Sequence, residues 1–348
     1  MISEASAPAL PDEQHQKTQD VFVLAHTPPG FRAFLGEEGL RQLVAAHPRA
    51  EVVLADDPDR FAALLPRADG AIMMPSLAPL LAPVLRLGGR LRWVHSIPAG
   101  IEGLLTPELV AAGRVALTSS KGSLGPLVAE QALLLLLALS RCLPGFVRNQ
   151  DERRWQAPSG QRPMRDLFGK TVLILGVGGI GGYLARICRV GLQMRVLGTA
   201  RTRRDNPHVE RYVEPEGLHA ALGEADFVVL CLALTNETAG LIDAAALAAM
   251  KPGAYLVNVA RGGLVEEDAL IAALQEGQIA GAGLDVTAIE PLPAESPLWA
   301  LPNVIITPHV ANGGDRSSDQ VLAFICENIR RFAEGEPLQG IVDRHARY

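Results

Sequence analysis

The sequence predicts an α/β protein with two domains, each built on a parallel β-sheet that is covered by helices. Three observations support this prediction. The chain has 348 residues, of which 48% are hydrophobic, and a chain of this length usually forms more than one domain. Short β-prone runs alternate with helix-favouring stretches, as they do in parallel sheets. A loop-like stretch at Arg148–Arg165 interrupts this alternation, which restarts at Thr171.

In the first half, five β-prone runs are separated by helix-favouring residues. They are Val21–Leu24, Glu51–Leu54, Ala71–Met74, Arg92–Ser96 and Val115–Thr118. Residues 1–19 are rich in Pro, Ala, Glu and Gln and lack the basic start and apolar centre of a secretory signal. We therefore expect residues 1–19 to form a disordered leader.

In the second half, six further β-prone runs predict a complete Rossmann sheet. They are Thr171–Leu175, Arg195–Leu197, Phe227–Leu232, Tyr255–Val259, Gly283–Val286 and Val304–Thr307.

Two predicted helices connect or complete these sheets. The helix that begins near Pro126 is apolar nearly all round, so more than one neighbour must bury it, and we expect it to join the domains. The last helix, at Ser317–Gly335, has apolar residues at spacings near the helical period. We expect it to pack against the first domain.

Composition favours a small-molecule partner. The formal net charge is -6, whereas nucleic acids and anionic membranes usually require a basic protein face. The longest apolar run, Ala132–Leu139, is much shorter than the ~18 residues that indicate a membrane span. The four cysteines lie far apart, without the close pairs of zinc or redox motifs, so we expect no metal site and free thiols in a cytoplasmic protein.

A glycine-rich motif follows the first β-prone run of the second half. Gly176, Gly178 and Gly181 form a Gly-x-Gly-x-x-Gly pattern before a predicted helix at Tyr183–Val190. In such a motif the first glycine permits a tight turn, the second lets the backbone approach a pyrophosphate, and the third lets the helix lie close to the strand. The motif predicts dinucleotide binding by these glycines together with Gly179 and Ile180. A glycine-rich turn that binds no ligand is the alternative.

The segment after the next strand indicates which nicotinamide cofactor is bound. An acidic residue about 20 positions beyond the glycines usually holds the ribose 2′-hydroxyl of NAD, and here no carboxylate appears before Asp205. Instead, Arg201, Arg203 and Arg204 flank Thr202 and would place positive charge where a 2′-phosphate lies. Charge matching favours NADP(H) over NAD(H). The alternative is that these arginines form a solvated loop and that either cofactor is accepted.

Three later motifs complete a family pattern. Ala260 and Arg261 lie within Asn258–Gly263, Asp285 lies within Gly283–Val286 with Glu290 and Pro291 just beyond, and His309 ends the motif Thr307–His309. Together with the glycine motif, they resemble the D-2-hydroxyacid dehydrogenase family (D-isomer specific 2-hydroxyacid dehydrogenases, glyoxylate/hydroxypyruvate reductase-like) from about Val21 to Val342. The resemblance implies an oxidoreductase that transfers a hydride between NAD(P)H and C2 of a small 2-oxo or 2-hydroxy acid with D-stereospecificity.

The resemblance implies a catalytic trio of Arg261, Glu290 and His309. Hydride reduction of a carbonyl places negative charge on its oxygen, so an acid must deliver a proton while a fixed cation holds the neighbouring carboxylate. His309 would be that acid, and the base in the reverse direction. Glu290 would orient the imidazole and favour its protonated form, and Arg261 would bind the substrate carboxylate. Taken singly, each has a structural alternative: a loop histidine, a solvated turn carboxylate and a surface arginine.

The resemblance also implies binding residues outside this trio. In the first domain, the backbone amides of Ala99 and Gly100, ahead of an expected helix at Ile101–Leu105, would bind the substrate carboxylate. Pro98 stands where the family usually has a small residue, and it removes one donor. In the second domain, Ala260 would contact the cofactor and Asp285 would hold its nicotinamide carboxamide. Ala233 and Asn236 depart from a loop that commonly carries proline at both positions.

The implied architecture is a Rossmann NAD(P)-binding domain at 118–309 inserted into a flavodoxin-like parallel-sheet substrate domain at 20–117 plus 310–348. We expect the cofactor in the crevice between the domains, where closure over the substrate would exclude water. The resemblance also implies a homodimer, with an interface formed by the helix Pro126–Cys142 and the arm Arg148–Arg165.

Two other functions are open to this sequence. Because the family includes transcriptional corepressors, one alternative is a nicotinamide-sensing regulatory protein, although the complete trio and the termini favour an enzyme. The other is a family member that oxidises a different small anion, such as formate or phosphite. The sequence does not indicate the side chain of the substrate.

Overall fold

The computed structural model describes residues 20–344 apart from 102, 158–162 and 203–204. The predicted leader at 1–19, two of the three cofactor-loop arginines, Arg203 and Arg204, and the end of the tail at 345–348 lie outside the described residues. The chain divides into two compact units. Unit 1 comprises the described residues of Met1–Ser120 and Leu322–Val342, and unit 2 those of Lys121–Val321 and Asp343–Tyr348.

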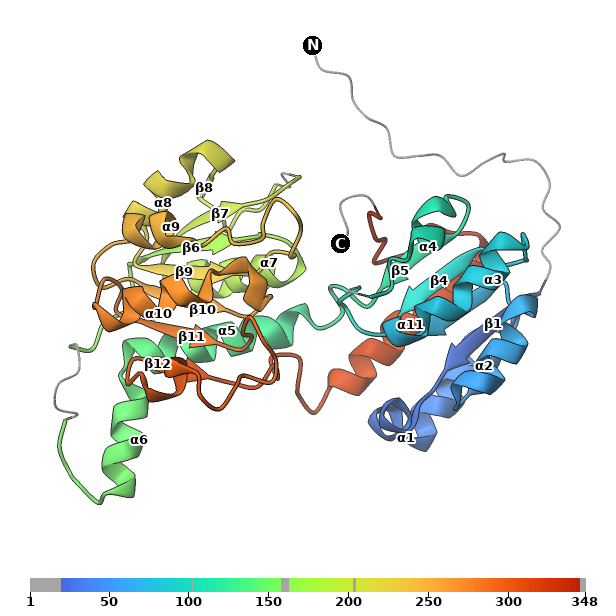
Figure 1. The fold of residues 1–348 in the computed structure, drawn as a ribbon, viewed down its shortest axis with the longest axis horizontal. Coiled ribbons are helices and arrows are strands. Elements are labelled where there is room, and N and C mark those ends of the chain that lie inside the picture. Colours follow the sequence, from blue (N-terminus) through green and yellow to red (C-terminus); the bar gives the residue numbers. More distant parts are fainter. Residues whose placement is uncertain (1–19, 102, 158–162, 203–204, 345–348) are drawn as a thin grey trace, which may run out of the picture. The chain divides into compact units, whose positions relative to one another are not determined.

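Unit 1 contains a five-stranded parallel sheet in the order β2-β1-β3-β4-β5, which is the flavodoxin-like order (Figure 1). All five predicted strands are present, with ends shifted by one or two residues. They are β1 (Val21–His26), β2 (Ala50–Ala55), β3 (Gly70–Met73), β4 (Trp93–Ser96) and β5 (Ala116–Ser119).

Short helices with local capping signals cover this sheet. The Asp57 side chain accepts a hydrogen bond from the Arg60 amide at the start of α2, and Thr106 caps α4 in the same way, each followed by a proline at the first helical position. The helices of unit 1 before its last segment are α1 (Pro29–Val44), α2 (Pro58–Leu64), η1 (Leu65–Arg67), η2 (Pro75–Leu80), α3 (Leu81–Arg86) and α4 (Pro107–Ala111).

The last helix, α11 (Ser317–Glu334), packs on the first sheet as the sequence predicts. The ring of Phe332 lies 5.1 Å from that of the fully buried Trp93, and the ring of Phe324 lies 6.2 Å from that of His95. The C-terminal part of the chain therefore completes the core of the first unit.

Unit 2 contains a seven-stranded parallel sheet in the order β12-β11-β10-β9-β6-β7-β8, which extends the Rossmann order by one strand. The prediction of six strands missed β8, which has only two residues, Arg211 and Tyr212, and pairs with β7 at the edge. The strands are β6 (Thr171–Leu175), β7 (Arg195–Thr199), β8 (Arg211–Tyr212), β9 (Phe227–Leu230), β10 (Tyr255–Asn258), β11 (Gly281–Leu284) and β12 (Val304–Ile306).

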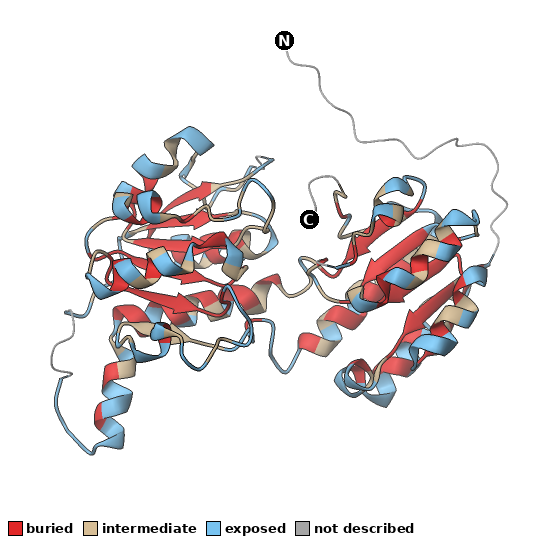
Figure 2. Ribbon diagram, viewed as in Figure 1, coloured by how far each residue is buried: buried red, intermediate tan, exposed pale blue. Residues whose placement is uncertain are grey.

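Helices cover both faces of this sheet, and its five inner strands, from β11 to β7, are mostly buried (Figure 2). One core forms where α5 (Gly125–Ser140) and α7 (Gly179–Arg186) pack against β6, β9 and β10. The other forms beneath α8 (Leu218–Glu224), α9 (Ala244–Ala249) and α10 (Glu267–Gln275). The remaining short helices are the π-helix η3 (Ile187–Gly191) and the 3₁₀-helices η4 (Pro215–Gly217), η5 (Gly262–Leu264) and η6 (Pro297–Ala300).

Among its described residues, the predicted loop at Arg148–Arg165 differs from the structure only in its first four, which are helical. Helix α6 spans Leu143–Asp151 and exposes Leu143, Phe146 and Val147 to solvent. Within the described residues, no single helix is long and apolar enough to cross a membrane. Only α5 and α6 together meet the length and composition of a span; they are bent by 69° at the break between them, and α5 is packed in the core.

Candidate active site

The site residues predicted in unit 2 follow the carboxyl ends of its parallel strands. Gly176 follows β6, Arg201 lies just beyond β7, Arg261 follows β10, Asp285 follows β11, and His309 follows β12. In a parallel sheet the carboxyl ends share one edge, and open α/β sheets bind their ligands there. The fold therefore collects residues that follow five strands at one edge of one unit.

The glycine turn has the geometry that a dinucleotide motif requires. Gly176 has a φ of +97°, and a Cβ atom there would lie 2.8 Å from the backbone of Leu232. A Cβ atom on Gly181 would overlap the carbonyl oxygen of Gly176, so the helix α7 approaches the turn as closely as a glycine allows. Gly178 precedes α7 and has open space around its missing side chain. Backbone amides at this helix start can therefore be reached by a pyrophosphate.

The end of β7 is tied to the glycine turn by Thr199. Its hydroxyl accepts a hydrogen bond from the Gly176 amide at 3.0 Å, and its carbonyl accepts one from the Val177 amide at 2.7 Å. Arg201, just beyond, is exposed and pairs with Asp343 at 3.3 Å. One of the arginines predicted to contact a 2′-phosphate thus lies two residues beyond Thr199, next to the exposed Thr202.

His309 and Glu290 are in direct contact, as the resemblance implies. The Nδ1 atom of His309 lies 2.7 Å from Oε2 of Glu290, and Oε1 of Glu290 accepts a hydrogen bond from the Thr287 amide at 3.2 Å. Both side chains are partly exposed, at 49% and 37%. The carboxylate is held by a backbone amide on one oxygen and contacts the imidazole with the other. Within the described residues, the Glu290 contact uses only the Nδ1 atom of the ring.

Arg261 is held in a tightly packed segment beside the Glu290 turn. A Cβ atom on the next residue, Gly262, would overlap the backbone carbonyl of Thr287. The buried Asn258 fixes this segment from the other side: its side chain donates to the Arg261 carbonyl at 2.9 Å and accepts from the Ala260 amide at 3.0 Å. The Arg261 guanidinium donates to the Ala260 carbonyl at 2.7 Å.

Asp285 is buried beneath the histidine loop. Its backbone carbonyl accepts a hydrogen bond from the His309 amide at 2.8 Å, and its carboxylate accepts bonds from the amides of Val310 and Ala311 at 3.1 and 3.0 Å. His309 has a φ of +53°, a left-handed conformation that costs a non-glycine residue roughly 1–2 kcal/mol. The bonds to Asp285 hold the loop in this unfavourable conformation.

The predicted substrate loop Ser96–Gly100 belongs to unit 1. The Ser96 hydroxyl contacts the carbonyls of Pro98 and Gly100 at 3.0 and 3.1 Å, and the Ile97 amide donates to β3. With no amide hydrogen on Pro98, the amides of Ala99 and Gly100 are those left for a ligand. The prediction of a helix at Ile101–Leu105 is wrong, since none of its described residues is helical and Gly103 has a φ of +80°, which a right-handed helix does not allow. The next helix begins at Pro107 after the Thr106 cap.

Comparison with known proteins places these features in one family. Residues 133–311 match the family model for D-isomer specific 2-hydroxyacid dehydrogenase, NAD binding domain. The glyoxylate reductase of Korarchaeum cryptofilum is 35% identical over 270 residues, which are 76% of this chain and 80% of that protein. The chain belongs to the D-isomer specific 2-hydroxyacid dehydrogenases. It is an NAD(P)-dependent oxidoreductase that transfers a hydride to or from small 2-oxo and 2-hydroxy acids.

Two further members of the family are similar to this chain to different extents. The D-3-phosphoglycerate dehydrogenase of Mycobacterium tuberculosis is 35% identical over 297 residues, which are 83% of this chain but only 54% of that protein. The crystal structure of the NADPH-dependent glyoxylate/hydroxypyruvate reductase of Sinorhizobium meliloti, in complex with NADP and sulfate, has a TM-score of 0.74 and 29% identity. That match covers 94% of this chain and 99% of the other.

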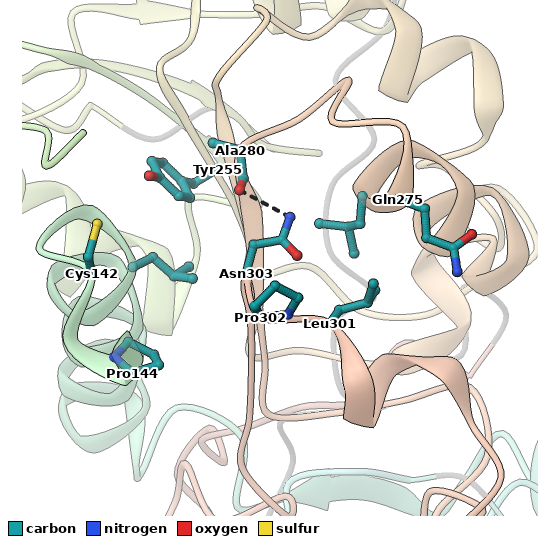
Figure 3. Close-up of a pocket in the computed structure, with 10 residues that line it drawn as sticks. Cys142, Pro144, Tyr255, Gln275, Ala280, Leu301, Pro302 and Asn303 are labelled. Carbon is teal, nitrogen blue, oxygen red and sulfur yellow. Dashed lines mark hydrogen bonds between the residues drawn. The ribbon is translucent and has the colours of Figure 1, made fainter. Parts of the chain in front are cut away.

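Two hollows of unit 2 lie at opposite ends of its strands. A hollow of about 290 Å³ borders the glycine motif and is lined by residues that include Gly178, Gly179 and Arg186. A larger one, of about 380 Å³, lies where β10, β11 and β12 begin, at the opposite edge of the sheet (Figure 3). Asn303 bonds the Ala280 carbonyl there at 3.2 Å. We associate the smaller hollow with cofactor binding because it borders the glycine motif, although the other hollow is larger.

Four supporting residues were not predicted from the sequence. Thr199, Asn258, Thr307 and Gln131 hold the glycine turn, the arginine segment and the histidine loop. Thr199 and Asn258 end their strands, so their position at a carboxyl end was a usable signal. Gln131 shows no such signal, because only the fold brings it to Thr307, which lies 176 positions further along the chain.

Proposed function

We propose that this dehydrogenase reduces a small 2-oxo acid to the D-2-hydroxy acid, with His309 as the proton donor and NADPH as the preferred reductant. The observation that carries the proposal is the 2.7 Å contact between His309 Nδ1 and Glu290 Oε2 at the carboxyl edge of a dinucleotide-binding sheet. Histidine paired with a fixed carboxylate is a standard donor of a proton to a developing alkoxide.

Each member of the trio has a distinct task in this mechanism. Glu290 accepts the Nδ1–H bond and so keeps the ring oriented, while Nε2–H of His309 donates its proton to the substrate oxygen in reduction and recovers it in oxidation. Arg261 binds the substrate carboxylate, for which its planar, permanently charged group is suited. Ala99 and Gly100 keep their predicted role in substrate binding, with unit 1 as the substrate domain.

The residues of unit 2 fit a nicotinamide dinucleotide. A side chain at Gly176 or Gly181 would clash with backbone atoms of the turn or of a neighbouring segment. Open space at Gly178 leaves the amides at the start of α7 accessible to phosphate. Ile180 and Ala260 complete the proposed binding surface, and Asp285 retains acceptor capacity on Oδ2 for the carboxamide. When bound, the nicotinamide supplies the hydride that adds to C2.

The preference for NADP(H) rests on charge. Arg201 and Thr202 follow β7, and no carboxylate precedes Asp205 in that segment. The 2′-phosphate of NADP is a bidentate partner for a guanidinium. The reductase of Sinorhizobium meliloti, which is NADPH-dependent, supports the same choice.

A steady-state panel tests the proposal. The protein is mixed with NADPH or NADH and with glyoxylate, hydroxypyruvate and larger alkyl or phenyl 2-oxo acids, and cofactor absorbance is followed. We expect loss of absorbance with at least one 2-oxo acid, a higher kcat/KM with NADPH, and a D-configured product. Failure to turn over any 2-oxo acid would refute it. A parallel assay with NADP⁺ or NAD⁺ in which formate or phosphite reduced the cofactor would then favour another small anion, and cofactor binding without any turnover would favour a regulatory role.

We also propose a cytoplasmic homodimer. Apolar side chains on α5, α6 and the following arm are exposed in one chain, among them Leu134 at 52%, Val147 at 47% and Trp155. A second copy of the chain would remove these side chains from water. The four free cysteines suit a reducing compartment. Light scattering coupled to gel filtration should give twice the monomer mass, and a monomer that is fully active would contradict the assembly.

A further inference from the structure

A chain of hydrogen bonds links the helix α5 to the histidine loop inside unit 2. The Gln131 side-chain nitrogen donates to the Thr307 hydroxyl at 3.0 Å, and this hydroxyl donates to Oδ1 of Asp285 at 2.5 Å. Because the hydroxyl has one hydrogen, accepting from Gln131 and donating to Asp285 uses it in a single defined direction. The Gln131 amide and the Asp285 carboxylate are therefore held in fixed orientations by one residue between them.

The same carboxylate determines the path of the backbone around His309. Oδ1 of Asp285 also accepts from the Val310 amide, and Oδ2 accepts from the Ala311 amide. One buried side chain therefore binds the backbone of both residues after the histidine. The His309 amide donates to the Asp285 carbonyl. A left-handed φ of +53° at His309 persists only because its surroundings hold it there.

Gln131 stands out on its own helix. Along α5 the residues that follow it, from Ala132 to Leu139, are all apolar, and many of them are buried against the sheet. A half-buried amide at this position costs free energy unless it is hydrogen-bonded, and here the Thr307 hydroxyl accepts its hydrogen bond. The Gln131 side chain therefore binds the residue two positions before the histidine.

We propose that Gln131 and Thr307 are positioning residues for the reaction: through Asp285 they set the orientation in which His309 presents its imidazole to the substrate. The inference rests on the proposed role of His309 as the proton donor. It assigns Asp285 a second task beside the carboxamide contact, and it gives α5 a part in the site. Loss of these hydrogen bonds would leave all catalytic groups present but would no longer hold the histidine loop in its orientation.

The variants Thr307→Val and Thr307→Ser separate this proposal from a purely structural role. Valine keeps the shape of threonine without its hydroxyl, whereas serine keeps the hydroxyl. With the best 2-oxo acid, we expect Thr307→Val to lower kcat about tenfold or more while KM for the acid and cofactor affinity, measured by fluorescence titration, stay within about threefold. Thr307→Ser should keep kcat within about threefold of the unmodified protein. Gln131→Met should resemble Thr307→Val.

A nuclear magnetic resonance measurement supplies a readout that does not need turnover. In protein labelled with ¹⁵N-histidine, the Nδ1 and Nε2 resonances of His309, assigned by their loss in His309→Ala, report its bond to Glu290. These resonances should shift in Thr307→Val and Gln131→Met and stay unchanged in Thr307→Ser. The control is Ser140→Ala, which removes a hydroxyl bond to the Leu137 carbonyl farther along α5 and should leave both readouts as they were.

The outcomes separate the two proposals. If the valine and serine variants had the same kcat and the same His309 resonances as the unmodified protein, the positioning role would be overturned. Equal losses in the valine and serine variants would overturn it too, since the hydroxyl would not be the cause. If no 2-oxo acid were turned over at all, the proposed function would fail, and the His309 resonances alone would still decide whether the hydrogen-bond chain orients the ring.

Discussion

Replacing Gly262 by alanine should misplace Arg261 relative to Glu290. The added Cβ would overlap the carbonyl carbon and oxygen of Thr287 and the amide nitrogen of Ala288. All three are backbone atoms, so no side-chain rotation relieves the overlap. The Arg261 segment and the turn that carries Glu290 must move apart.

The size of the effect follows from this overlap. Ordinary carbon contacts lie at about 3.5 Å, so the two backbone segments must separate by more than about 1 Å. A displacement of about 1 Å at reacting groups costs roughly 100-fold in rate. We therefore expect kcat/KM of Gly262→Ala for the best 2-oxo acid to fall about 100-fold, with a loss of unfolding free energy of about 1–3 kcal/mol from overpacking.

The neighbouring glycine provides a matched control. A Cβ atom on Gly263 would lie 3.1 Å from a terminal carbon of Leu234, the flexible end of a side chain that can move. Steady-state kinetics and urea unfolding of both variants test the reasoning. Gly263→Ala should keep kcat/KM within about threefold. If Gly262→Ala were as active as Gly263→Ala, the close approach of the two segments would not be what positions Arg261.

Three further predictions concern the cofactor and stability. Gly176→Ala should weaken NADPH binding more than about tenfold in a fluorescence titration, because of the +97° φ and the Leu232 contact at 2.8 Å, whereas Gly191→Ala, with open space around it, should bind normally. Arg201→Ala should raise the dissociation constant for NADPH about tenfold and leave that for NADH within about threefold, and equal losses for both would refute the 2′-phosphate assignment. Burial lowers the pKa of His95 from 6.5 to about 3, so the unfolded chain takes up a proton below pH 6.5 that the folded chain refuses, and stability falls as the pH falls. Between pH 7.5 and 5.5 urea unfolding should show about 1.4 kcal/mol more loss in the unmodified protein than in His95→Gln, and parallel losses would contradict this.

The strands were predictable because their signal is local. Runs such as Val172–Leu175 are apolar throughout, as expected for strands buried on both faces, and the structure contains all eleven predicted strands. The two-residue strand β8 is polar and exposed at the edge, so no run of apolar residues marks it. Helix α6 was missed because it mixes charge, Pro144 and Gly145 with outward-facing apolar residues.

The sequence allowed us to predict which strand ends carry the site. It did not allow us to predict the individual hydrogen bonds. The motifs place Arg261, Asp285 and His309 at carboxyl ends of strands, where parallel topology gathers them. The hydrogen bond from Thr307 to Asp285 and the left-handed backbone at His309 depend on packing between segments distant in sequence. The prediction of a helix at Ile101–Leu105 failed because Gly103 has a φ of +80°, which a right-handed helix does not allow.

The central claim is that His309 exchanges the proton while a separate surface binds the cofactor. Single-turnover reduction of a 2-oxo acid by His309→Ala, with NADPH affinity measured on the same sample, tests it most directly. We predict a loss of at least about 100-fold in the rate of NADPH oxidation, with a dissociation constant for NADPH within about threefold of that of the unmodified protein. A variant that oxidised NADPH at the full rate would contradict the account.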